Sequence, residues 1–261
     1  MLDPAIFRTY DIRGIVGETL DVARVKLIGQ AIGSFVRDRQ GLRIAVARDG
    51  RLSSESFQAA LIEGLISSGC EVVNVGMVPT PLLYFAAKEW QLDAGVMVTG
   101  SHNPANYNGF KVVMNGQSLT AEEIQTVYQR ANSGDLLAGQ GSETHLAVEE
   151  KYLAMVLNRV QFKKPLKIVI DSGNGVTGQL APRLFRALGC DVLELYCEID
   201  GRFPNHHPDP CDASNLTDLV AAVKAHQAAV GLAFDGDGDR LGVVTATGEI
   251  ICADRLLMVF A

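Results

Sequence analysis

Short apolar segments alternate with longer segments of helical periodicity along most of this chain. Residues 43–47, 71–75 and 95–98 are three such apolar segments. Between them, residues 57–65 place apolar side chains three and four positions apart, which is typical of an amphipathic helix. Strands that alternate with helices pair mainly in parallel and are covered by helices on both faces of the sheet. The pattern therefore predicts an α/β fold.

The same plan begins again in the second half of the chain. Residues 166–170 form an apolar segment, and residues 176–188 have helical spacing. The sequence Gly189-Cys190-Asp191-Val192 resembles Gly69-Cys70-Glu71-Val72, each at the expected start of a second strand. In both copies the third strand runs into the loop that is richest in chemical groups. Ligands of open α/β sheets bind at the carboxyl ends of strands, so these two loops are the candidate site.

This repeat predicts two consecutive three-layer α/β/α domains with mainly parallel, mixed sheets. We expect the first domain to span residues 1–147 and the second residues 148–249, which suits a chain of 261 residues. Residues 250–261 read as the start of a third domain, because the apolar helix that begins at Asp254 is too short to be stable alone. We expect the C-terminal domains of the parent chain to be missing.

Composition excludes several classes of protein. The chain is 48% hydrophobic and 20% charged, which is typical of a soluble globular protein. A net charge of −7 argues against nucleic acid as a partner. No apolar run is long enough to cross a bilayer, and the N-terminus lacks a signal sequence. Five cysteines without a CxxC pair indicate neither disulfides nor zinc, so we expect a cytoplasmic protein without a membrane partner.

The strongest chemical signal is the loop Asp235-Gly236-Asp237-Gly238-Asp239-Arg240. Three carboxylates at alternate positions, separated by glycines, can converge on one hard cation, which indicates Mg²⁺ or Ca²⁺ rather than zinc. An EF-hand would require Gly at the sixth position and Glu at the twelfth, where Arg240 and Ala246 stand. The remaining alternative is a solvated acidic turn.

A second loop, Thr99-Gly100-Ser101-His102-Asn103-Pro104, offers a serine at the end of an apolar strand. A hydrolase elbow needs glycine two residues before and after the serine, where Thr99 and Asn103 stand. A serine that acts in phosphoryl transfer needs a nearby cation and positive side chains instead. Gly109-Phe110-Lys111 could supply a lysine. By itself such a serine loop is usually only a turn, but beside an aspartate loop it becomes a candidate site.

Two other segments leave different functions open. Residues 173–178 fit GxGxxG after a strand, and Glu198 follows about twenty residues later, which together match the dinucleotide fingerprint of an oxidoreductase. This interpretation leaves the serine and aspartate loops unexplained. The pair His206-His207 with Asp209 could bind a transition metal, but a rigid polar loop between prolines is the simpler interpretation.

Several motifs together resemble one family, the α-D-phosphohexomutases. The resemblance extends over essentially the whole chain, and within the family it is greatest to the bacterial phosphomannomutase/phosphoglucomutase branch. Phosphoglucosamine mutases are the alternative, although their usual FGTDGIRG and ASHNP motifs differ from this sequence. The matching motifs are Tyr10-Asp-Ile-Arg-Gly14, Thr99-Gly-Ser-His-Asn-Pro104, Gly109-Phe-Lys111, Phe203-Pro-Asn-His-His-Pro-Asp-Pro210 and Asp235-Gly-Asp-Gly-Asp-Arg240.

The resemblance implies a role for each site residue. It implies that Ser101 carries the transferred phosphate as phosphoserine, and that Lys111 or Arg13 acts as general acid/base. The Mg²⁺ ligands that it implies are Ser101, Asp235, Asp237 and Asp239. The side chains that it places around the phosphoryl group and the substrate are Tyr10, Arg13, His102, Lys111 and Arg240.

The implied activity is that of an isomerase, an intramolecular phosphotransferase of carbohydrate metabolism. It would interconvert hexose 1-phosphate and hexose 6-phosphate, with glucose 1,6-bisphosphate as the activator and intermediate. In the family, a third domain recognises the sugar and a fourth binds the phosphate that is not transferred. Because neither is present, we expect this chain by itself to be weakly active or inactive. A non-catalytic module that binds Mg²⁺ and a phosphorylated sugar is a further alternative.

Overall fold

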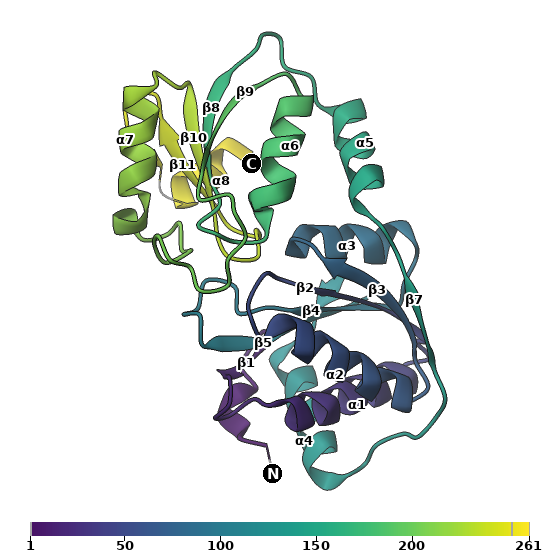
Figure 1. Ribbon diagram of the computed structural model, residues 1–261. Coiled ribbons are helices and arrows are strands. Elements are labelled where there is room, and N and C mark those ends of the chain that lie inside the picture. Colours follow the sequence, from purple (N-terminus) through teal and green to yellow (C-terminus); the bar gives the residue numbers. More distant parts are fainter. Residues whose placement is uncertain (1, 252, 261) are drawn as a thin grey trace. The chain divides into compact units, whose positions relative to one another are not determined.

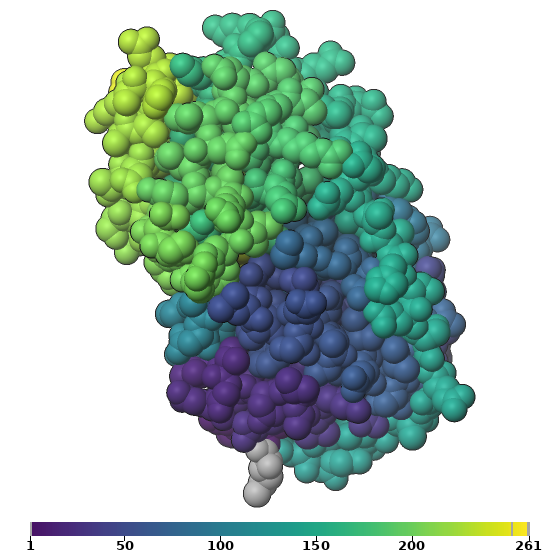
Figure 2. All heavy atoms as spheres, viewed as in Figure 1, coloured from purple at the N-terminus to yellow at the C-terminus, as the bar shows by residue number. Residues whose placement is uncertain are grey.

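The computed structural model describes residues 2–251 and 253–260, which form two compact units. Unit 1 contains the residues up to Gly100 together with Pro104–Val148, and unit 2 contains Ser101–Asn103 and the residues from Glu149 onward. Both units are drawn as ribbons in Figure 1 and as atoms in Figure 2, where the N-terminal segment, in purple, is part of the surface of unit 1. Cys252 and Ala261, in the segment expected to begin a third domain, lie outside the described residues.

Unit 1 has a mixed sheet in which the central strands are parallel. The strand order is β1-β5-β4-β2-β3-β7, and β6 pairs with β5. Strands β2, β3, β4 and β7 pair in parallel, whereas β5 is antiparallel to both β4 and β1. The elements of unit 1 are η1 (Pro4–Ile6), β1 (Ile12–Ile15), α1 (Val22–Asp38), β2 (Arg43–Arg48), α2 (Ser54–Ser67), β3 (Glu71–Met77), α3 (Thr80–Glu89), β4 (Ala94–Val98), β5 (Tyr107–Met114), β6 (Gln117–Ser118), α4 (Ala121–Ser133) and β7 (Ser142–His145).

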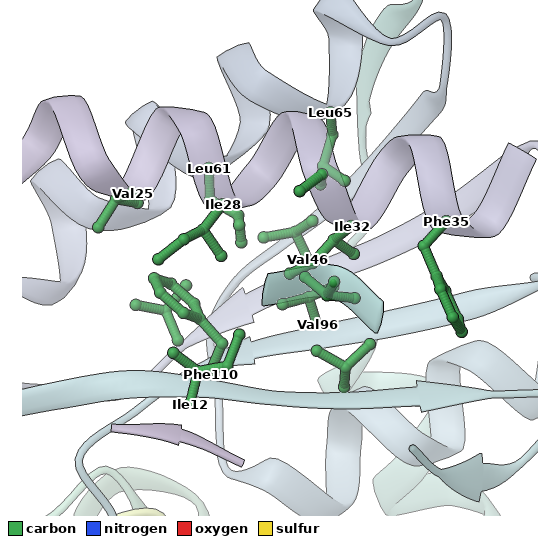
Figure 3. Close-up of a cluster of buried hydrophobic side chains, with 14 of the residues drawn as sticks. Ile12, Val25, Ile28, Ile32, Phe35, Val46, Leu61, Leu65, Val96 and Phe110 are labelled. Atoms are coloured by element: carbon green, nitrogen blue, oxygen red, sulfur yellow. The ribbon is translucent and has the colours of Figure 1, made fainter. Parts of the chain in front are cut away.

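Helices cover both faces of this sheet. In Figure 1, α1, α2 and α4 lie on one face and α3 lies on the other. The main core lies under α1 and α2, where each large side chain that leaves water stabilises the fold by about 1.5–3 kcal/mol. The side chains labelled in Figure 3 belong to this core: Ile12, Val25, Ile28, Ile32, Phe35, Val46, Leu61, Leu65, Val96 and Phe110.

Helices α1 and α2 approach each other closely because each has a glycine at the contact. A Cβ atom on Gly64 would lie 2.1 Å from the carbonyl oxygen of Lys26, and one on Gly29 would lie 2.5 Å from the carbonyl oxygen of Leu61. Real Cβ atoms do not approach backbone atoms this closely, because the atoms would overlap. The two glycines therefore set the distance between the two helices that cover the core.

Unit 2 has a smaller mixed sheet with the order β12-β11-β10-β8-β9. Strands β8, β9 and β10 are parallel, and β11 is antiparallel to its neighbours β10 and β12. The elements of unit 2 are α5 (Glu149–Arg159), β8 (Lys167–Asp171), α6 (Thr177–Ala187), β9 (Asp191–Leu195), η2 (Ala213–Leu216), α7 (Thr217–Ala225), β10 (Val230–Phe234), β11 (Leu241–Thr245), β12 (Ile250–Ile251) and α8 (Ala253–Phe260).

Successive side chains of β8 face opposite layers of unit 2. Ile168 and Ile170 belong to the core that includes Ala181 of α6, whereas Val169 belongs to the core that includes Leu219 of α7. A strand buried on both faces has this continuous apolar sequence. The fold class expected from the sequence, two α/β/α domains with mainly parallel mixed sheets, is therefore confirmed.

The two units also repeat one topology. The order β4-β2-β3 in unit 1 corresponds to β10-β8-β9 in unit 2. In each unit an antiparallel strand, β5 or β11, then pairs with the first strand of this order, β4 or β10. Gly69 and Gly189, which precede the second strand of each copy, both have a φ of +88°. Glycine reaches this left-handed conformation without steric cost, so both copies end a helix in the same way.

Two further expectations concern membranes and thiols. None of the described helices combines the length and apolar character needed to cross a bilayer. Cys70, Cys190 and Cys197 are buried and Cys211 is exposed, and all four are free thiols. Burial raises the pKa of Cys197 to about 11, which keeps this thiol protonated and unreactive at neutral pH.

Candidate metal and phosphoryl site

The serine loop follows β4 and holds Ser101 in an unusual backbone conformation. Ser101 has a φ of +49° and is 2% exposed. A residue other than glycine in this left-handed region costs about 1–3 kcal/mol, and such residues cluster at functional sites. Residues Ser101–Asn103 belong to unit 2 by their contacts, whereas Gly100 and Pro104 belong to unit 1.

The aspartate loop joins β10 to β11 in unit 2 and curls around the carboxylate of Asp235. Oδ1 of Asp235 accepts hydrogen bonds from the backbone N–H groups of Asp239 and Arg240, each at 3.0 Å. The side chains of Asp235 and Asp237 are buried, and Asp239 is exposed. The loop thus turns its carboxylates toward one point, as the alternating sequence predicts.

The three carboxylates form a cluster with the chemistry of a magnesium site. One oxygen each from Asp235, Asp237 and Asp239 lie within 4.8 Å of one another. The Oγ of Ser101 donates a hydrogen bond to Oδ2 of Asp235 at 2.9 Å, so the serine lies beside this cluster within unit 2. Hard oxygen donors of this kind, and in this number, fit Mg²⁺, which usually completes its shell with water and phosphate oxygens.

Glycine at position 236 makes the approach of the serine possible. A Cβ atom there would lie 2.5 Å from the carbonyl oxygen of Ser101. The glycines of the loop therefore do more than let the backbone curl, because Gly236 also leaves space for the serine.

Two other expected site residues lie in the same unit. Nδ1 of His102 is 3.4 Å from Oγ of Ser101, and which atom donates depends on the tautomer of the histidine. The backbone of Arg240 contacts Asp235 as described, and its Nη1 lies 3.9 Å from Oδ1 of Asp209. Arg240 thus places a half-buried positive charge next to the aspartate loop.

The remaining expected residues belong to unit 1. Arg13, on β1, is 4% exposed and donates hydrogen bonds to the carbonyl oxygen of Thr99 and to Asp11, both at 2.6 Å. Burial raises the pKa of Asp11, but the nearby arginines outweigh it and hold that pKa below its usual value. Lys111 lies on β5 opposite Met97 of β4. Tyr10 is 74% exposed.

Two buried charged residues in the turn after β2, Asp49 and Arg51, have no role that the sequence patterns predict. Both contact the ends of the serine loop within unit 1. Their only signal in the sequence is a charged turn that directly follows an apolar strand. Such turns are usually solvated, so their burial could be known only from the structure.

The GxGxxG segment does not offer a free set of N–H groups to a pyrophosphate. The N–H of Gly173 donates to Asp171, and that of Asn174 donates to the carbonyl oxygen of Tyr196. The next two N–H groups, of residues 175 and 176, donate to backbone carbonyl oxygens as well. A dinucleotide fold uses such groups to bind phosphate, so this arrangement disfavours the oxidoreductase interpretation.

In the histidine pair, the ring of His206 contacts a buried carboxylate and, within the part of the chain that the structure describes, does not face a set of metal ligands. Nε2 of His206 lies 3.1 Å from both carboxylate oxygens of Asp171, which is fully buried. Burial lowers the pKa of His206, but the hydrogen bonds to Asp171 and to the carbonyl oxygen of His207 outweigh it, so the pKa is raised. Among the described residues this pair is not part of a cluster of three ligating side chains.

Two family models match most of this chain. Residues 4–138 match the family description "Phosphoglucomutase/phosphomannomutase, alpha/beta/alpha domain I", and residues 150–248 match that of domain II. The chain is 54% identical over 260 residues to a phosphomannomutase/phosphoglucomutase of Pseudomonas aeruginosa, covering 100% of this chain and 56% of the relative. It is 50% identical over 258 residues to a phosphoglucomutase of Neisseria gonorrhoeae, covering 98% of this chain and 56% of the relative.

A solved structure is similar over the whole chain. It is a phosphoglucomutase/phosphomannomutase family protein from Burkholderia thailandensis, with a TM-score of 0.96 and 49% sequence identity. The match covers 100% of this chain and 58% of that protein. The chain thus spans little more than half the length of the relatives it matches.

Proposed function

Because the chain belongs to the phosphoglucomutase/phosphomannomutase family, we propose that it carries the phosphoryl-transfer site of a phosphohexomutase. The reaction interconverts hexose 1-phosphate and hexose 6-phosphate. A phosphoserine gives its phosphoryl group to the monophosphate, and the resulting 1,6-bisphosphate returns its other phosphoryl group to the serine. We assign this chemistry to the cytoplasm, as a step of carbohydrate metabolism.

One observation carries the proposal: the hydroxyl of Ser101 lies 2.9 Å from a carboxylate oxygen of the aspartate cluster. Ser101 is then the phosphate carrier, and Asp235, Asp237 and Asp239 are the ligands of Mg²⁺. Bound Mg²⁺ supplies charge neutralisation at the phosphoryl oxygens. In the free enzyme, Asp235 accepts the hydrogen bond of the serine hydroxyl and so fixes the direction in which the serine oxygen points.

The positive side chains of the site supply the remaining stabilisation. Arg13, Lys111 and Arg240 steady the phosphoryl oxygens, since phosphoryl transfer depends mainly on positioning and charge. Lys111 is the better general acid/base, because arginine stays protonated and Arg13 already binds Asp11 and a backbone carbonyl. His102 assists at the serine, and the exposed Tyr10 contacts the sugar.

The length of the chain limits what it does alone. It spans 56% of the first relative. Beyond the contact of Tyr10, we assign the contacts to the sugar hydroxyls and to the distal phosphate to the part of the relatives that this chain does not cover. Such contacts supply the binding energy that aligns the reacting oxygen. We propose that this chain accepts a phosphoryl group from glucose 1,6-bisphosphate but turns over hexose phosphates weakly or not at all.

Intact mass spectrometry after incubation with Mg²⁺ and glucose 1,6-bisphosphate tests the proposal. We expect one phosphate on the unmodified chain and none on Ser101→Ala, with Ser56→Ala, at an exposed position of α2, as the matched control. A coupled assay for glucose 6-phosphate measures turnover, and nicotinamide dinucleotides are titrated in parallel. Phosphate on Ser101→Ala, or dinucleotide binding without phosphorylation, would refute the assignment. Mg²⁺ and sugar phosphate binding without phosphorylation would identify a non-catalytic module.

A further inference from the structure

The turn after β2 contains a buried ion pair to which the proposed reaction gives no role. Asp49 is 1% exposed and Arg51 is 2% exposed, and Nε of Arg51 lies 3.2 Å from Oδ2 of Asp49. The free energy needed to remove two charges from water exceeds the free energy of their mutual attraction, unless further hydrogen bonds satisfy both groups. A buried pair is therefore weak evidence for stability, and its hydrogen-bond partners indicate its purpose better.

The carboxylate of Asp49 binds the first stem of the serine loop. Its Oδ2 accepts hydrogen bonds from Oγ1 of Thr99 at 2.8 Å and from the N–H of Gly100 at 3.1 Å. Its Oδ1 accepts from the N–H of Arg51 at 3.0 Å and from the hydroxyl of Ser54. Because all these groups donate, the position needs a carboxylate that accepts with both oxygens.

The guanidinium of Arg51 binds the second stem of the same loop. Its Nη1 donates to the carbonyl oxygens of Pro104 at 2.6 Å and of Tyr107 at 3.0 Å. The guanidinium also lies directly against Gly100, where a Cβ atom would be 2.2 Å from Cζ of Arg51. The arginine thus reaches from one end of the loop to the other, and it needs glycine at position 100.

We propose that Asp49 and Arg51 are positioning residues that clamp both stems of the serine loop and thereby hold Ser101 for phosphoryl transfer. The inference rests on the proposed role of Ser101 as phosphate carrier. Only Ser101, His102 and Asn103 lie between the two anchored stems, so few backbone conformations remain to the loop. The clamp accounts for the φ of +49° at Ser101, a conformation that persists only when the surroundings over-determine it.

The test compares Arg51→Lys with the unmodified chain in two measurements. Lysine keeps the charge opposite Asp49 but lacks the planar fork that spans the loop. We expect faster amide hydrogen exchange in residues 99–107. We also expect the maximal rate of Ser101 phosphorylation by glucose 1,6-bisphosphate to fall about 100-fold, the effect of a misplacement of about 1 Å, at unchanged half-saturation.

A matched control is Arg130→Lys. Arg130 is also a largely buried arginine of unit 1, pairs with Asp38, and donates to the carbonyl oxygen of Asp135, but it does not contact the serine loop. We expect this variant to be phosphorylated at the same rate as the unmodified chain. We also expect the amide hydrogens of residues 99–107 to exchange at the same rate in both. Equal losses in both variants would indicate a general loss of structure and would overturn the clamp.

A milder variant, Thr99→Val, removes one hydrogen bond to Asp49 and keeps the shape of the side chain. We expect it to slow phosphorylation about tenfold, and it decides the question if Arg51→Lys does not fold. Unchanged loop exchange with an unchanged maximal rate in whichever variant folds would refute the clamp. If the unmodified chain accepts no phosphate, the proposed function fails, whereas the exchange measurement still accepts or refutes the clamp by itself.

Discussion

Replacing Asp237 with asparagine should have opposite effects on the stability of unit 2 with and without Mg²⁺. Asp235 and Asp237 are both fully buried, and their facing oxygens lie within 4.8 Å of each other. Two negative charges at this distance repel by about 3 kcal/mol at the effective dielectric constant of about 20 that suits protein sites. Asparagine removes one of these charges, and part of the gain is offset by weaker hydrogen bonds. We expect the metal-free variant to be more stable by about 1–2 kcal/mol. For a unit of this size, each kcal/mol raises Tm by about 4 °C.

With Mg²⁺ the order reverses. A ligand that binds only the folded state stabilises it by RT ln(1 + [L]/Kd), about 2.7 kcal/mol at a hundredfold excess over Kd. Losing one carboxylate weakens binding, so the Mg²⁺-dependent rise in Tm should shrink or disappear in Asp237→Asn. Differential scanning calorimetry in EDTA and across a Mg²⁺ series measures both effects. Asp191→Asn, which removes an exposed charge from unit 2, is the matched control. An Asp237→Asn variant less stable in EDTA and equally stabilised by Mg²⁺ would refute the reasoning.

Three further predictions concern the fold. Gly64→Ala places a Cβ atom 2.1 Å from a backbone oxygen of α1. We expect the free energy of unfolding, measured in urea, to fall by about 1–3 kcal/mol, although alanine has the better helix propensity. Equal stability would contradict the close approach of the two helices. Thr120→Ala removes the capping box of α4 and should cost about 0.5–2 kcal/mol in the same measurement. The raised pKa of His206 means that its contact with Asp171 stabilises unit 2 fully below pH about 6.5 and less as the pH rises through that pKa. His206→Gln should remove this dependence from a Tm series against pH, whereas His226→Gln, at an exposed position, should retain it.

The layers of the fold could be predicted because the apolar periodicity is local. The parallel strands β2, β3 and β4 of unit 1 and β8, β9 and β10 of unit 2, with the helices between them, each carry their signal within a few residues. The pairing of strands β1 and β5 cannot be predicted in this way, because it is antiparallel and joins Ile12 to Phe110 across almost a hundred positions. Helix α4 is not among the predicted helices, although Thr120 and Glu123 form a capping box that a local search could detect.

In the candidate site, too, local features can be predicted from the sequence and long-range contacts cannot. Ser101 and the three aspartates can be proposed from the sequence alone, because the chemistry that they suggest depends on residue type and close spacing within single loops. The role of Asp49 was not, because its contact with Thr99 joins positions 50 residues apart and depends on burial. No spacing rule distinguishes a buried acceptor of several hydrogen bonds from an aspartate in an ordinary turn.

The narrow space at Gly236 has a consequence for the interpretation of related sequences. A protein with alanine at this position would retain all three carboxylates and would still match a search for metal ligands. Its methyl group would nevertheless occupy the space 2.5 Å from the serine carbonyl, so the loop and the serine could not approach as they do here. Under the proposed function, we expect such a protein to keep the carboxylates that would bind Mg²⁺ but to accept phosphate on the serine poorly. A search for this site should therefore require the glycine between the first two aspartates as well as the aspartates themselves.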